Sequence, residues 1–211
     1  MSTAQPDSHS PERLVKVQVL QTIEEVNARG PMTADAFERF AAVNGRCELI
    51  DGKVHLMSPA GSEHGFIAAQ ILVALGSHLK SKKIGRVYAA ETGFVVSRNP
   101  DTVRAPDVAF IRRERLPEVE AQGFGHITPD LVFEVISPSD TPEMIQSKTE
   151  MWLAAGVQVV NVFPSTRTVV KHAGADSTEF NIDDTINLSD VVEDWRPTTR
   201  ELFGSSEEGL D

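Results

Sequence analysis

Cysteine is almost absent from this chain of 211 residues, because Cys47 is its only one. An internal disulfide and a zinc site built from several cysteines are therefore excluded. Long hydrophobic runs are also missing, since no stretch approaches the roughly 18 apolar residues of a membrane-spanning helix. The polar segment from Met1 to Glu12 contains Pro6 and Pro11, where a secretion signal would need an apolar centre. We therefore expect a cytoplasmic protein with no membrane partner.

Basic residues are in deficit, with 20 bases against 31 acids and a formal net charge of −11. A nucleic-acid partner normally requires a basic surface. The deficit is concentrated near the end, because residues 176–211 hold 11 acids and 2 bases, which leaves a net charge of −2 for residues 1–175. The other bases form two local groups, which are either solvated faces or phosphate contacts: Lys80, Lys82, Lys83 and Arg86, then Arg112, Arg113 and Arg115. The net charge alone therefore does not exclude nucleic acid.

The length and the hydrophobic content of 40% indicate one globular domain. We predict a leader and a helix over residues 1–32, the domain over 33–203 and an acidic tail over 204–211. Spacing and turn residues predict four helices, over 12–29, after Thr33 as N-cap, over 63–83 with Ser62 as cap, and over 140–155 before Gly156. They also predict hairpins over 47–57 and 157–172, strands over 87–90 and 93–97, and buried strands over 107–111 and 131–136. This order favours an α/β or α+β fold with a mixed central sheet.

Two acids stand where buried strands favour hydrophobic residues. Asp107 opens the run Pro-Asp-Val-Ala-Phe-Ile, and Glu134 lies within Leu-Val-Phe-Glu-Val-Ile. A buried carboxylate is costly unless it is paired or bound to a cation. If the two strands are neighbours, both acids can hold one Mg²⁺ or Mn²⁺ ion. Lys148, on the following predicted helix, would orient water or stabilise charge on a phosphate.

A purely structural interpretation of the same acids stays open. Asp107 would then begin its strand in an ordinary Pro-Asp turn, and Glu134 would pair with a buried arginine such as Arg104. Trp152 and Phe133 are interpreted as core residues, not as platforms for stacked bases.

Several segments together resemble one family. They are residues 47–54 with Met57-Ser58-Pro59, His64, residues 103–108, residues 132–139, Lys148 through Val157, and the closing segment 188–203. With them the chain resembles the Uma2 family of endonucleases, within the restriction-endonuclease-like PD-(D/E)xK superfamily, over about residues 33–203. The resemblance implies a mixed central sheet flanked by helices, and a Mg²⁺- or Mn²⁺-dependent nuclease.

The resemblance also implies roles for particular residues. Asp107 and Glu134 would be the metal ligands. Lys148 would be the active-site lysine moved onto the helix, because Ile136 occupies the position where the general superfamily motif has lysine. Glu48 would be a further acidic site residue, or else an exposed hairpin carboxylate. His64 would act in proton transfer or phosphate contact, or else as a structural residue at a helix start.

The chain departs from the family pattern at Val160-Asn161-Val162-Phe163-Pro164, where the family commonly has an aromatic-rich strand ending in Asp-Pro. Our leading hypothesis is a metal-dependent endonuclease that cuts DNA as a homodimer, since two-fold symmetry supplies two sites for two strands. One alternative is a catalytically silent member that binds nucleic acid or protein. Another is a metal phosphoesterase for a small nucleotide.

Overall fold

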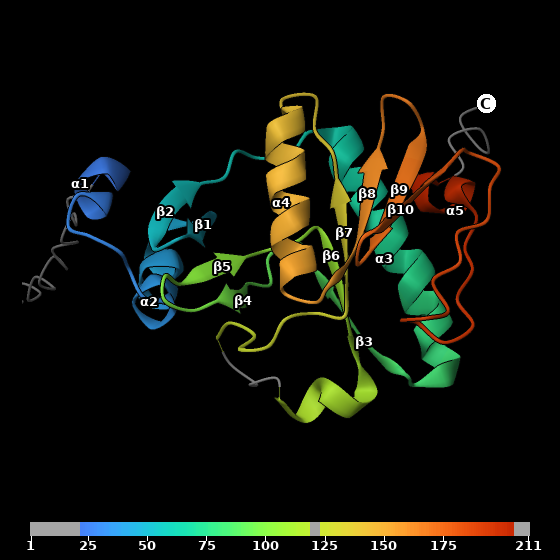
Figure 1. Cartoon of the computed structure of the whole chain (residues 1–211), viewed down its shortest axis with the longest axis horizontal. Helices are drawn as coiled ribbons and strands as arrows, with labels where there is room; N and C mark the ends of the chain where they lie inside the picture. The colour runs from blue at the N-terminus through green and yellow to red at the C-terminus, as the bar shows by residue number, and fades with distance from the viewer. Residues whose placement is uncertain (1–21, 119–122, 205–211) are drawn as a thin grey trace, which may run out of the picture.

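The strands of the computed structural model, which describes residues 22–118 and 123–204, form two sheets (Figure 1). The smaller sheet has the order β2-β1-β5-β4 and contains β1 Cys47–Ile50, β2 Lys53–Leu56, β4 Phe94–Ser97 and β5 Thr102–Arg104. The larger sheet has the order β10-β9-β8-β7-β6-β3 and contains β3 Gly85–Ala89, β6 Val108–Arg112, β7 Leu131–Val135, β8 Gln158–Phe163, β9 Thr168–Ala173 and β10 Asp176–Phe180. The helices are α1 Ile23–Asn27, α2 Ala34–Asn44, α3 Ser62–Lys82, the 3-10 helix η1 Arg113–Glu118, α4 Pro142–Ala154 and α5 Thr199–Phe203.

The six-stranded sheet confirms the predicted mixed α/β architecture. Its neighbouring strands are antiparallel except β7 and β8, which run parallel. A parallel pair needs a crossover connection, and α4 lies between these two strands in the chain. The crossover through α4, the predicted helix that carries Lys148, therefore allows the parallel pair that makes this sheet mixed.

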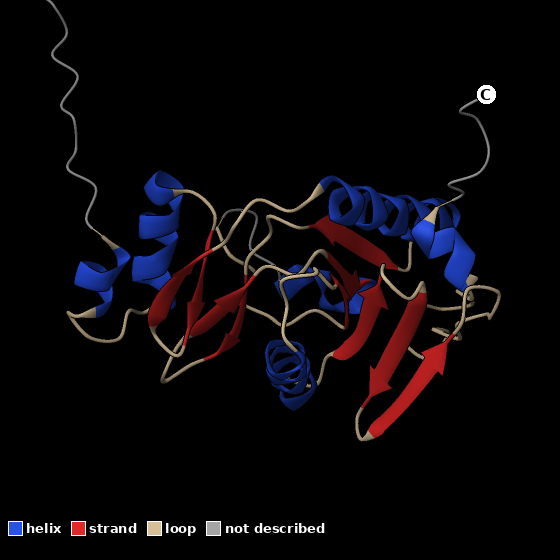
Figure 2. Ribbon diagram, turned by 90° about the horizontal axis from the view of Figure 1, so that it is seen from above, coloured by secondary structure: helices blue, strands red, loops and turns tan. Residues whose placement is uncertain are grey.

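The two faces of the larger sheet are covered by different helices, as α3 and α4 lie on opposite sides of it (Figure 2). Successive residues of a strand point to opposite faces. On β7, Leu131, Phe133 and Val135 pack in the cluster of α3, whereas Val132 packs in the cluster of α4. Glu134 lies between Phe133 and Val135, so this alternation directs its side chain towards α4.

The smaller sheet lies beside the larger one and is packed by α1 and α2. The sequence did not reveal it as a separate sheet, because the predicted strands over 87–90 and 93–97 carried no signal for their pairing. They are β3 and β4, and each pairs with a strand of a different sheet. The chain passes from β5 of the smaller sheet directly into β6 of the larger one through residues 105–107.

The predicted helix boundaries agree with the structure at some ends and differ at others. Thr33 caps α2, and Gly156 follows α4 with a φ of +78°. The helix predicted over residues 12–29 instead begins at Ile23, because Thr22 is an extended N-cap in a capping box with Glu25. Its predicted part over residues 12–21 lies outside the described residues.

The long helix α3 also starts differently from the prediction. Its N-cap is Gly61, with no side-chain cap, so Ser62 is the first helical residue and not the cap. No helix in the described parts of the chain is long and apolar enough to span a membrane.

Candidate active site

Asp107 and Glu134 meet at one end of the β6–β7 pair. These strands are antiparallel with Val108 opposite Phe133, and continuing the register by one residue puts Asp107 opposite Glu134. The Asp107 carboxylate accepts a hydrogen bond of 2.8 Å from the backbone N–H of Val135. The two acids that stood apart in the sequence therefore lie side by side, with Asp107 immediately before β6 and Glu134 in β7, as the metal-site hypothesis requires.

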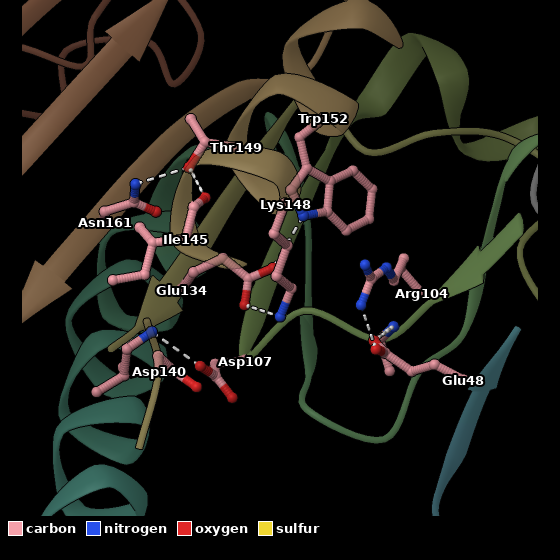
Figure 3. A network of polar contacts seen from close by, with 12 residues as sticks. Glu48, Arg104, Asp107, Glu134, Asp140, Ile145, Lys148, Thr149, Trp152 and Asn161 are labelled. Atoms are coloured by element: carbon pink, nitrogen blue, oxygen red, sulfur yellow. Dashed lines mark hydrogen bonds and ion pairs between the residues drawn. The ribbon is translucent and has the colours of Figure 1, made fainter. Parts of the chain in front are cut away.

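Both oxygens of the Glu134 carboxylate are bound by side chains of α4 (Figure 3). Lys148 Nζ donates to Oε2 at 2.7 Å, and Trp152 Nε1 donates to Oε1 at 2.8 Å. Lys148 and Trp152 are four residues apart, so they lie on one face of the helix. The Glu134 side chain is only 5% exposed. Glu134 is thus a buried acid held by one cation and one neutral donor.

The electrostatics of this pair depend on burial. Burial raises the pKa of Glu134 to about 7, and the nearby Asp107 charge acts in the same direction, whereas Lys148 opposes the shift. Burial acts to lower the pKa of Lys148, but the charges of Glu134, Glu48 and Asp107 outweigh it and raise that pKa. Lys148 is therefore an ammonium ion at neutral pH, in an environment that favours cations.

His64 lies in the first turn of α3 and contacts Asp107. Its Nε2 is 2.9 Å from Asp107 Oδ1, and the two side chains are 17% and 15% exposed. The hydrogen bond to Asp107 raises the pKa of His64, burial opposes this, and the charges of Asp107, Asp140 and Glu134 raise it further. His64 is not a helix cap, because α3 has no side-chain cap. It joins α3 to the acidic site.

Glu48 is a buried member of an ion pair, so the interpretation as an exposed hairpin carboxylate is wrong. It is 6% exposed, its Oε2 accepts from Arg104 Nη1 at 2.5 Å, and its Oε1 accepts from the N–H of Ala105 at 3.1 Å. The alternative pairing of Glu134 with Arg104 is also wrong, because Lys148 takes that place. Glu48 lies close enough for its charge to raise the pKa of Lys148.

Asn161, which marks the departure from the family pattern, belongs to a buried polar contact beside this site. It aligns with Glu134 in the parallel β7–β8 register and is 3% exposed. Its Nδ2 donates to Thr149 Oγ1 at 2.9 Å, and that hydroxyl donates to the carbonyl of Ile145 at 2.8 Å. Asn161 therefore ties α4 to β8 next to Lys148. Its polarity within an apolar run was the one sequence signal for this contact.

The two basic groups of the sequence lie at the other end of the same strands. Gly85 pairs with Arg112 at that end, whereas Ala89 pairs with Val108 near Asp107. Several of these bases are in ion pairs or backbone contacts: Lys82 with Asp194 at 2.7 Å, Arg115 with Asp130 at 3.0 Å, and Arg112 with the carbonyl of Asp190 at 2.8 Å. These three bases are therefore engaged in contacts within the protein, at the end of the strands away from Asp107.

The two candidate ligands, Asp107 and Glu134, suit a metal ion that needs few protein ligands. Within residues 22–118 and 123–204, no group of three His, Cys, Asp or Glu side chains could hold a metal. Mg²⁺ is commonly bound through one or two carboxylates, with waters and substrate phosphate as its other ligands. Asp107 and Glu134 supply such a pair. Lys148 shows that a positive charge is already accommodated at Glu134 Oε2.

Comparisons with known proteins identify the family and the fold of the chain. Residues 34–200 match the family Uma2, described as "Putative restriction endonuclease". The chain belongs to the Uma2 family. Its fold is similar to the crystal structure of a "putative nuclease belonging to DUF820" from Anabaena variabilis ATCC 29413, with a TM-score of 0.69 and 20% sequence identity over 82% of this chain and 98% of that one. No protein with a curated description is similar enough to match. The resemblance inferred from the sequence is confirmed, and the family supports a nuclease-type function.

Proposed function

We propose that this Uma2 protein is a metal-dependent endonuclease that hydrolyses phosphodiester bonds of DNA. Asp107 and Glu134 would hold Mg²⁺ or Mn²⁺, and Lys148 would act beside them. The observation that carries the proposal is the meeting of two carboxylates from neighbouring strands with a lysine ammonium 2.7 Å from one of them. Two carboxylates placed this close attract a cation, and Lys148 already supplies one at Glu134.

The side chains of the site have complementary tasks in this reaction. When bound, the divalent ion supplies positive charge that offsets the phosphate and favours attack by water. Lys148 reaches the site from α4 and places its ammonium where negative charge develops on the phosphate. His64, hydrogen-bonded to Asp107, holds a proton at the edge of the site and is positioned to exchange it.

The ion pair of Arg104 with Glu48 affects the net charge near the proposed substrate site. Arg104 neutralises Glu48, so the buried hairpin acid does not add an unpaired negative charge near the substrate. The side chain of Lys148 is 28% exposed, while its ammonium faces the Glu134 carboxylate. A phosphodiester approaching the metal ligands would meet this ammonium.

A non-catalytic binding role is the second candidate, since the net charge of −11 favours a protein partner over nucleic acid.

A plasmid-nicking assay with Mn²⁺ distinguishes the endonuclease from the non-catalytic binding protein. We expect nicking by the wild type and its loss in Glu134→Gln. The matched control is Glu179→Gln, which changes an exposed glutamate on the edge strand β10.

Each other result of that assay has a defined meaning. Nicking that persists in Glu134→Gln refutes the assigned site. Hydrolysis of nucleotides but not of plasmid identifies a small-nucleotide phosphoesterase. A protein that binds Mn²⁺ weakly or not at all, and cuts neither substrate, is the silent binding member.

A further inference from the structure

Trp152 makes a hydrogen bond to Glu134 that its packing in the core does not by itself explain. The side chain is fully buried, at 0% exposure, and packs with Ala109, Ile111 and Val132 on the α4 face of the sheet. A buried indole N–H needs an acceptor, which a backbone carbonyl often supplies. Here the acceptor is instead the carboxylate of Glu134 at 2.8 Å. The most deeply buried donor of α4 is therefore directed at an acid of the candidate site.

The two donors that hold Glu134 differ in their freedom to move. Lys148 has a flexible stem with several rotatable bonds and a side chain that is 28% exposed, so it has alternative conformations open to it. Trp152 is a rigid ring enclosed by core residues and has no such alternative. If a cation replaces the Lys148 ammonium at Oε2, the Trp152 hydrogen bond at Oε1 remains.

We propose that Trp152 is the positioning residue for Glu134. Its N–H holds Oε1 on the α4 side and thereby keeps Oε2 turned towards the place where Lys148 now lies and where a metal would bind. Lys148 would release Oε2 to a bound ion, and Trp152 would hold the carboxylate with or without that ion. This assignment rests on the proposed metal-dependent function, and it adds the group that orients one of the two ligands.

The chain offers a matched pair of variants to test this role. Trp152→Phe keeps an aromatic ring but removes the N–H. Trp195→Phe makes the same substitution at the only other tryptophan, which is also buried but packs edge-on against Phe133, in the cluster of α3. Among the described residues, no hydrogen bond from the Trp195 indole to another side chain or to the backbone is present.

Titration calorimetry with Mg²⁺ on the full chain measures the effect. Loss of a group that orients a metal ligand commonly weakens affinity about 10- to 100-fold, and we expect that range for Trp152→Phe. For Trp195→Phe we expect a change of less than about twofold, because it touches no ligand. Circular dichroism and thermal unfolding check that both variants are folded.

A spectroscopic measurement on the unaltered chain keeps the proposal testable even if Trp152→Phe does not fold. Two tryptophans give two indole N–H signals in a ¹⁵N–¹H correlation spectrum, and each single variant assigns one. We expect Mg²⁺, and separately Glu134→Gln, to shift the Trp152 signal and leave the Trp195 signal in place.

The outcomes separate this inference from the proposed function. If wild type binds no Mg²⁺, both are overturned. If wild type binds Mg²⁺ while the Trp152 signal stays unchanged, or while folded Trp152→Phe binds as tightly as wild type, the positioning role alone is wrong and the metal site stands.

Discussion

Replacing Glu134 by glutamine should change how the stability of the metal-free protein depends on pH. Burial raises the folded-state pKa of Glu134 from 4.5 to about 7. A group whose pKa is raised on folding contributes stability that is fully present below the unfolded pKa and is lost as pH rises through the folded pKa. Glu134 therefore destabilises the wild type progressively between about pH 4.5 and pH 7.

The size of the effect follows from the shift. One pKa unit corresponds to about 1.4 kcal/mol, so the full shift is on the order of 3 kcal/mol, and most of it, about 2 to 3 kcal/mol, is lost between pH 5 and pH 8. Glutamine keeps a side-chain oxygen for the N–H of Trp152 and does not titrate. The stability of Glu134→Gln relative to wild type should therefore rise with pH by that amount.

Urea unfolding at pH 5 and pH 8, with a chelator present, measures the two differences in free energy. Groups remote from Glu134 titrate alike in both proteins, so their contributions cancel when the variant is compared with wild type at each pH. His64, whose pKa the Glu134 charge raises, does not cancel fully, so the same comparison is made in a His64→Gln background. Glu179→Gln, on the exposed β10 edge, should show no such trend. If Glu134→Gln differs from wild type equally at both pH values, Glu134 has an ordinary pKa and our account of its burial is wrong.

The other predictions concern the metal, the lysine, the helix contact and the assembly. Asp107→Asn should stay folded but bind Mg²⁺ more weakly in calorimetry, as should Glu134→Gln, and unchanged affinity in both would remove the site. Lys148→Ala should still bind metal but nick plasmid on the order of a hundredfold more slowly, which corresponds to about 3 kcal/mol in activation free energy. A loss of only a few-fold would transfer its role to Arg104 or His64. Asn161→Ala should lower the free energy of unfolding by about 1 to 3 kcal/mol, measured in urea, because it removes a buried hydrogen-bond partner of α4; no change would mean that water replaces the amide. Light scattering should give a homodimer, and duplex cleavage by a monomer would contradict this.

The candidate site was readable from the sequence where polarity conflicted with the local pattern. Asp107 and Glu134 stood in apolar runs, and a buried acid demands a partner wherever it lies in a sheet. The same argument indicated strands of one sheet, since continuous apolar runs are typical of strands covered on both faces. The helix that carries Lys148 followed from its helical spacing and from Gly156, although its N-cap is Thr141 and it begins at Pro142, not at residue 140. These inferences needed only neighbouring residues.

The choice among partners was decided by the tertiary structure. From the sequence, Glu134 had Arg104 or a metal as its candidate partners, and Glu48 had either solvent or the site. Strand register put Asp107 opposite Glu134, and the packing of α4 supplied Lys148 and Trp152, which left Arg104 for Glu48. Local spacing reports which face of an element a residue occupies, but not which element covers that face. The pairing of charges, the raised pKa of Glu134 and the role of the Trp152 N–H all depend on that covering, because they arise from side chains brought together across two strands and a helix.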